Sequence, residues 1–163
     1  MSRDRELVGV GGWLGFFVVI IAIISPLRIA VEMVMLHNDP EMQLVFGDAW
    51  PVINAMDWGL AAFQLALCFF MAWRLLNVHE PQTVRLVIAG LWIIGPGVML
   101  VEFLLIGALS DLPVGELLAA GGGVEVVRSI VFATVWTAYF RLSKRVANTY
   151  HHARGEQAAE VFS

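Results

Sequence analysis

Four long apolar stretches, separated by short polar connections, dominate the pattern of this 163-residue chain. They cover residues 11–36, 52–76, 86–109 and 123–142. Each is long enough to form the helix of about 20 apolar residues that crosses the hydrocarbon core of a bilayer. The pattern predicts an all-α polytopic membrane protein. Its four transmembrane helices are expected to form an antiparallel bundle, a single domain over residues 1–150, with a polar cytoplasmic tail over 151–163.

Composition agrees with this class of protein. The chain is 59% hydrophobic and only 15% charged, whereas soluble domains are about half apolar and a quarter charged. The apolar run from Leu7 to Leu27 is too long for the core of a signal peptide, and no small-residue cleavage site follows it. We therefore expect the first helix to be retained, and the short connections leave no room for a separate soluble domain.

The distribution of basic residues predicts the orientation. Eight of the ten Lys and Arg residues flank helix ends that share one side of the predicted membrane, and the connections 37–51 and 110–122 contain none. The eight are Arg3, Arg5, Arg74, Arg85, Arg141, Lys144, Arg145 and Arg154. Because short loops rich in Lys and Arg stay in the cytoplasm, we expect both termini there.

Six charged residues lie inside the predicted spans away from their cytoplasmic ends, at similar depth toward the outside. They are Arg28, Glu32, Asp57, Glu102, Glu125 and Arg128. Such residues usually face the bundle interior and pair, because a charge in lipid is costly. Arg28 and Glu32 are four residues apart, and Glu125 and Arg128 three, so each arginine has an acid on its own helix face. Asp57 and Glu102 have no such neighbour. We expect the bundle to bring these two acids to the arginines across helices.

Two interpretations of these six residues stay open. They form either an outward-facing pocket for a ligand or ion, or a structural set of charges that pair to fix helix packing or extend to the headgroups. Helix breaks are predicted nearby, at Pro26 and at Gly95-Pro96-Gly97. Interrupted helices line the binding sites of transporters, although a proline also produces a simple kink. Glu102, the most deeply placed acid, is the expected functional carboxylate if the protein moves ions or protons.

Several kinds of chemistry have no support in the sequence. No histidine lies inside a predicted span, so no haem ligand is available there. Ser25, Ser129 and Ser143 have no histidine at a matching depth, and no cluster has the spacing of metal ligands. No basic, aromatic-rich soluble face is present for nucleic acid. We therefore predict no catalytic residue, cofactor, metal or nucleic-acid partner.

Motifs at the two ends of the chain resemble a known family. The opening has Gly11-Gly12-Trp13-Leu14, followed by Ser25-Pro26-Leu27. The closing run is Trp136-x-x-Tyr139-Phe140-x-x-Ser143-Lys144-Arg145-Val146-x-x-Thr149-Tyr150. Both resemble small bacterial inner-membrane proteins of the domain-of-unknown-function family 2569, whose members usually end in Thr-Phe. The resemblance implies a four-helix protein of the bacterial inner membrane and brings no activity.

In physical terms, the closing motif is an aromatic anchor followed by a basic stop. Ser143, Lys144 and Arg145 are expected to lie at anionic headgroups, where each basic residue contributes about 1 kcal/mol. The same patch is a candidate docking site for a partner.

Three classes of function follow from these features. The first is a non-catalytic accessory subunit of a larger membrane complex, favoured by the small size, the short loops and the absence of catalytic motifs. The second is an oligomeric transporter or channel that uses the charged residues. The third is a lipid-handling enzyme at the outer leaflet, for which only Arg28 and Arg128 offer phosphate ligands. The expected partners are the lipid bilayer and either a larger complex or further copies of the chain.

Overall fold

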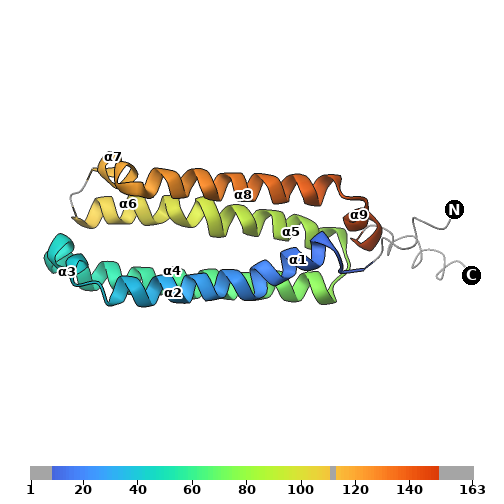
Figure 1. Ribbon diagram of the computed structural model, residues 1–163, viewed down its shortest axis with the longest axis horizontal. Coiled ribbons are helices and arrows are strands. Elements are labelled where there is room, and N and C mark those ends of the chain that lie inside the picture. Colours follow the sequence, from blue (N-terminus) through green and yellow to red (C-terminus); the bar gives the residue numbers. More distant parts are fainter. Residues whose placement is uncertain (1–8, 111–112, 151–163) are drawn as a thin grey trace, which may run out of the picture.

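The computed structural model describes residues 9–110 and 113–150, and these residues form helices and no strand (Figure 1). Four helices are long and apolar enough to cross a membrane: Trp13–His37, Pro40–Asn77, Pro81–Ser110 and Gly123–Leu142. They run alternately up and down the bundle. The predicted all-α fold with four spans is confirmed, and the chain is a multi-pass membrane protein. The predicted tail over 151–163 lies outside the described residues.

The spans are built from shorter elements with few interruptions. In chain order they are α1 (Trp13–Val19), η2 (Ile20–Ile24), α2 (Ser25–His37), α3 (Pro40–Phe46), η3 (Gly47–Ala49), α4 (Trp50–Asn77), α5 (Pro81–Trp92), η4 (Ile93–Gly97), α6 (Val98–Ser110), α7 (Val114–Leu117), η5 (Leu118–Gly122), α8 (Gly123–Leu142) and α9 (Lys144–Tyr150). The elements η2 and η4 are π-helical turns, η3 is a 3₁₀ turn, and η5 contains a kink at Gly121, whose φ is +116°.

Prolines and a capping aspartate fix several helix starts. Pro81 opens α5 and Pro51 lies in the first turn of α4, where the missing N–H of proline costs nothing. The third span therefore begins before residue 86, where the apolar pattern had placed it. The connection predicted over 37–51 contains α3, which Asp39 caps by accepting a hydrogen bond from the Glu41 amide at 2.9 Å.

The two ends of the bundle are packed differently. α1 begins, α8 ends and α9 lies at one end, together with the α4–α5 connection; we call this the termini end (Figure 1). The opposite end carries α3 and α7, and we call it the loop end. The main core fills the half near the termini end. Its buried members are Leu14, Phe17, Val18, Ile21, Met71, Ala72, Leu75, Val84, Val87, Leu91, Ala133, Trp136, Phe140, Val146 and Tyr150.

The half near the loop end has much less buried apolar surface. Its separate cluster joins α2 to α4 through Ile29, Met33 and Ala61. Val98 is the only buried residue of α6, and no residue between 123 and 132 of α8 is buried. The four spans are thus held together mainly near the termini end. The six charged residues singled out in the sequence lie in the other, more loosely packed half.

Candidate functional site

The two arginines in the half of the bundle near the loop end pair with acids on their own helices. Arg28 and Glu32 form an ion pair on α2, and Arg128 Nη1 lies 2.7 Å from Glu125 Oε1 on α8. Their spacing in the sequence predicted both contacts, which are confirmed. The Arg28 side chain is 60% exposed and that of Arg128 is 71% exposed. Neither makes an ion pair with another helix among the described residues, so the predicted pairing across helices is wrong.

Across helices, acids rather than opposite charges lie within electrostatic range of one another. Asp57 on α4 is only 7% exposed, and its Oδ1 atom is buried without a hydrogen-bond partner among the described residues. Glu102 on α6 is half-buried and lies within electrostatic range of the carboxylates of Asp57 and Glu32. Three helices therefore bring three carboxylates to one region. We call Glu32, Asp57 and Glu102 the carboxylate cluster.

This cluster does not have the geometry of a metal site. Among the described residues, no three His, Cys, Asp or Glu side chains are placed to hold one metal ion. A carboxylate such as Asp57, enclosed in an apolar bundle and lacking a cation, can neutralise a passing cation or exchange a proton with water. The guanidinium of Arg28 on α2 is already engaged by Glu32.

The predicted helix breaks are π-helical turns inside continuous helices. The turn η2 ends two residues before Pro26, and η4 contains Gly95, Pro96 and Gly97. A π turn widens the helix by one residue and so accommodates the absent N–H and the bulk of a proline ring. The backbone stays helical on both sides. These segments are therefore not the unwound stretches that expose free backbone groups in transporters.

Polar groups on neighbouring helices meet the turn η4. Gln64 Nε2 on α4 donates a hydrogen bond to the Ile94 carbonyl oxygen at 3.0 Å. On the other side, Gly95 approaches α8 so closely that an added Cβ would lie 3.6 Å from Ser129 Cβ. Gln64 was missed in the sequence, although a glutamine in the middle of an apolar span was a visible signal. Asn54, whose Oδ1 is also buried without a partner among the described residues, was missed as well.

The predicted patch of Ser143, Lys144 and Arg145 connects α8 to α9. Ser143 ends α8 in an extended conformation, and its Oγ accepts a hydrogen bond from the Val146 amide at 3.5 Å. Lys144 is exposed. Arg145 instead turns toward the N-terminal segment, where an added Cβ on Gly11 would lie 2.9 Å from its Nη1 atom.

The same contact region joins the opening and closing motifs. The Gly9 amide donates a hydrogen bond to Thr149 Oγ1 at 3.0 Å. Gly12 has a φ of +57°, a conformation that strains residues with a Cβ, and the guanidinium of Arg145 lies beside it. The glycine pair thus provides both the turn and the space that the arginine occupies. The spacing within each motif gave no sign of this contact.

Comparison with known proteins adds a family but no activity. No curated protein and no solved structure matches the chain. The sequence model of one family, described as "Protein of unknown function (DUF2569)", matches residues 7–151, which is most of the chain. The family inferred from the sequence is confirmed, and the chain belongs to the DUF2569 family.

Proposed function

We propose that this protein is a small, non-catalytic subunit that docks on a larger membrane protein in the bacterial inner membrane. The observation that carries the proposal is the exposure of two ion pairs, Arg28–Glu32 and Glu125–Arg128, within the spans. A protein whose charged side chains point away from its own core at membrane depth needs another polar surface to receive them.

The depth of these pairs supports the argument. Arg28 lies nine residues before His37, the last residue of its span, which corresponds to about 14 Å of helix. Arg128 lies five residues after Gly123, or about 8 Å. At the helix centre a charge costs about 2.5–3.5 kcal/mol on insertion scales, and less near the interface. A partner helix that supplies hydrogen-bonding groups removes this cost, and the loosely packed half leaves room for it.

The orientation belongs to the same proposal. The described basic residues at the termini end are Arg74, Arg85, Arg141, Lys144 and Arg145, and Glu80 is the one described acid there. Because Lys and Arg in short loops favour the cytoplasm, we propose that the termini end is cytoplasmic. The docking surface then lies in the outer half of the membrane.

A photo-crosslinking experiment tests the docking surface. The full-length tagged protein carries a photoreactive amino acid at Val31 or Val127, which are exposed beside Arg28 and Arg128. Phe69, exposed on α4 nearer the termini end, is the matched control position. Illumination of native membranes and purification in mild detergent should give one larger adduct from Val31 or Val127 and much less from Phe69. Equal labelling from all three positions, or a purified mass equal to one lipid-bound chain, would overturn the proposal.

The carboxylate cluster favours a second candidate function, an oligomeric transporter or channel for ions or protons. Asp57 is buried without a hydrogen-bond partner for Oδ1 among the described residues, and Glu102 lies near it. One four-helix bundle encloses little space, so this function calls for several copies around a shared path. The same purification separates the two candidates. A mass that is a multiple of this chain alone favours the transporter, and a stoichiometric second protein favours the subunit.

A further inference from the structure

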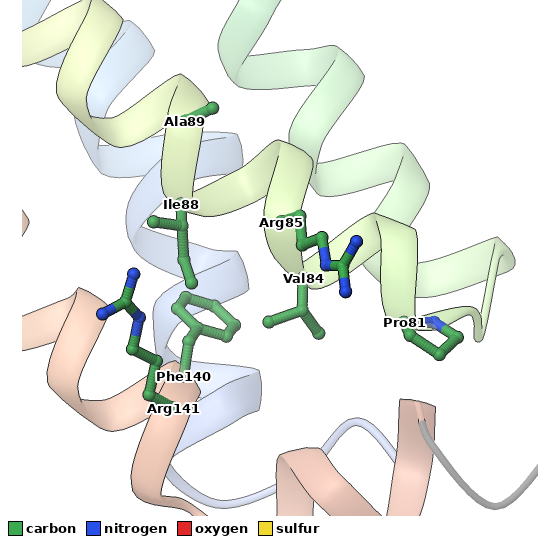
Figure 2. Close-up of a pocket in the computed structure, with 7 residues that line it drawn as sticks. All are labelled: Pro81, Val84, Arg85, Ile88, Ala89, Phe140 and Arg141. Atoms are coloured by element: carbon green, nitrogen blue, oxygen red, sulfur yellow. The ribbon is translucent and has the colours of Figure 1, made fainter.

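A groove lies between α5 and α8 at the termini end, far from the carboxylate cluster. Its volume is about 460 Å³, and residues from the start of α5 and the end of α8 line it (Figure 2). Val84 and Phe140 form an apolar floor; both are buried members of the main core. Ile88 continues this floor along α5 and packs against the same core. The floor is thus a fixed surface, because the core behind it holds each of these side chains.

Two arginines border the apolar floor. Arg85 extends from α5 and Arg141 from α8, on opposite sides of Phe140 (Figure 2). Both side chains are exposed, and neither has an ion pair or a hydrogen bond within the part of the chain that the structure describes. Glu80, the one described acid at this end, lies 3.9 Å from Arg74. The groove therefore combines an apolar surface with two positive charges that no described acid neutralises.

The depth of the groove matches that of a lipid headgroup. Arg85 lies in the second turn of α5, four residues after Pro81, and Arg141 is next to the last residue of α8. Both guanidinium groups are therefore at the level where a span leaves the hydrocarbon core. Val84 lies at this level, and Ile88 lies almost one turn farther into the span, where an acyl chain runs.

We propose that this groove binds one anionic phospholipid from the leaflet at the termini end. Arg85 and Arg141 hold its phosphate, since the planar guanidinium donates paired N–H groups to phosphate oxygens. One acyl chain lies on the floor formed by Val84, Ile88 and Phe140. Basic pockets between transmembrane helices recognise anionic headgroups in this way, and the apolar floor selects a lipid over a free anion.

Lipid retention by the full-length protein tests the site. The purified, delipidated protein is mixed with dioleoyl phosphatidylglycerol, with dioleoyl phosphatidylcholine or with inorganic phosphate, and native mass spectrometry counts the bound molecules. We expect one tightly held phosphatidylglycerol and no comparable retention of phosphatidylcholine or phosphate. Equal retention of the two lipids would show that charge does not select the lipid. Retention of phosphate alone would identify a site for a free anion. Either result overturns the proposal.

Matched variants separate the groove from general positive charge. Arg85→Gln and Arg141→Gln should each weaken phosphatidylglycerol binding roughly five- to tenfold, as expected for the loss of one basic contact near a membrane surface. Arg74→Gln removes the same charge at this end from a residue that lies outside the groove and pairs with Glu80, and it should leave binding within about twofold. If Arg74→Gln weakens binding as much as the groove variants, the lipid is held by the net charge of this end and the site is refuted.

A further variant tests the floor without changing charge. Ala89 lines the groove and is exposed, so Ala89→Trp fills the space without entering the core. Binding of phosphatidylglycerol should fall at least as much as in Arg85→Gln. Thermal unfolding without lipid checks that every variant is folded. A folded Ala89→Trp protein with unchanged lipid binding would show that the acyl chain does not use this surface.

Discussion

The hydroxyl of Tyr150 donates a hydrogen bond to the backbone carbonyl oxygen of Leu75, at 2.6 Å. Tyr150 belongs to α9 and is fully buried, while Leu75 lies in the last turn of α4. The last four carbonyl groups of a helix have no partner within it, so the tyrosine satisfies one of them inside the core. Burial raises the pKa of this phenol above its usual range, which keeps the hydroxyl a donor.

Tyr150→Phe should therefore lower stability while keeping the fold. The variant retains the ring but leaves the buried Leu75 carbonyl unpaired, at a cost of about 1–2 kcal/mol in the free energy of unfolding. Tyr139→Phe is the matched control, because the Tyr139 hydroxyl donates no hydrogen bond to any residue that the structure describes. Denaturant unfolding in detergent measures both. Equal effects of the two substitutions would contradict this role of Tyr150.

Gly90→Ala should destabilise the contact between α4 and α5. An added Cβ would lie 2.3 Å from Met71 Sδ, and Met71 is itself enclosed by the core, so either the sulfur or the helix must shift. Such overpacking costs about 1–3 kcal/mol. Gly59→Ala, on an exposed position of α4 with no atom within 4 Å of the added Cβ, should be neutral or stabilising by up to about 1 kcal/mol. In thermal unfolding, the melting temperature should fall for Gly90→Ala and should stay the same or rise for Gly59→Ala.

Glu102→Gln distinguishes a working carboxylate from a structural one. The substitution keeps the shape of the side chain and removes one negative charge near Asp57 and Glu32. Relief of repulsion should raise the free energy of unfolding on the order of 1 kcal/mol, as Coulomb's law gives for charges in a protein. If the protein moves protons or ions, flux into proteoliposomes should be lost in this folded variant.

Glu116→Gln is the control for that experiment, since Glu116 is exposed on α7 at the loop end. It should change neither stability nor flux. A Glu102→Gln protein that is less stable than the parent would show that Glu102 makes a favourable contact as a charged group. Unchanged stability, flux and cellular behaviour would remove Glu102 from the candidate site.

Cysteine labelling tests the proposed orientation. In a background where Cys68 is replaced by alanine, Leu44→Cys places a thiol on α3 and Leu142→Cys places one at the end of α8; both side chains are highly exposed. A membrane-impermeant reagent added to intact cells should label position 44 and not position 142, because the positive termini end is expected inside. The opposite pattern would reverse the orientation.

The spans and the two local ion pairs were predictable because their causes are local. Hydropathy over about 20 residues defines a span, and a spacing of three or four residues brings Glu125 to Arg128 on one helix face. Even the start of α8 at Gly123 agrees with the apolar pattern. None of these features depends on how one span is rotated against the next.

The arrangement of Arg28 and the carboxylate cluster was not predictable, because it depends on the rotation of each helix. Arg28 follows the π turn η2, and Glu102 follows the π turn η4. Each extra residue in a π turn rotates the following side chains by about 100° relative to a regular α-helix. The apolar pattern shows that a proline is present but not how the helix accommodates it. For that reason the sequence paired Glu102 with the arginines, whereas in the structure it lies within electrostatic range of Asp57 and Glu32.

The contact between the two chain ends has a consequence for the order of synthesis. The Gly9 amide has no hydrogen-bond partner until Thr149 is synthesised, 140 residues later. The space beside Gly11 is likewise not filled until Arg145 has been made. A ribosome delivers the first span to the membrane long before either partner exists. The first helix must therefore be inserted and oriented without them, and the termini end closes only after the fourth span has been made. A chain released prematurely within α8 contains the first three spans but lacks Arg145 and Thr149, which contact its N-terminal segment.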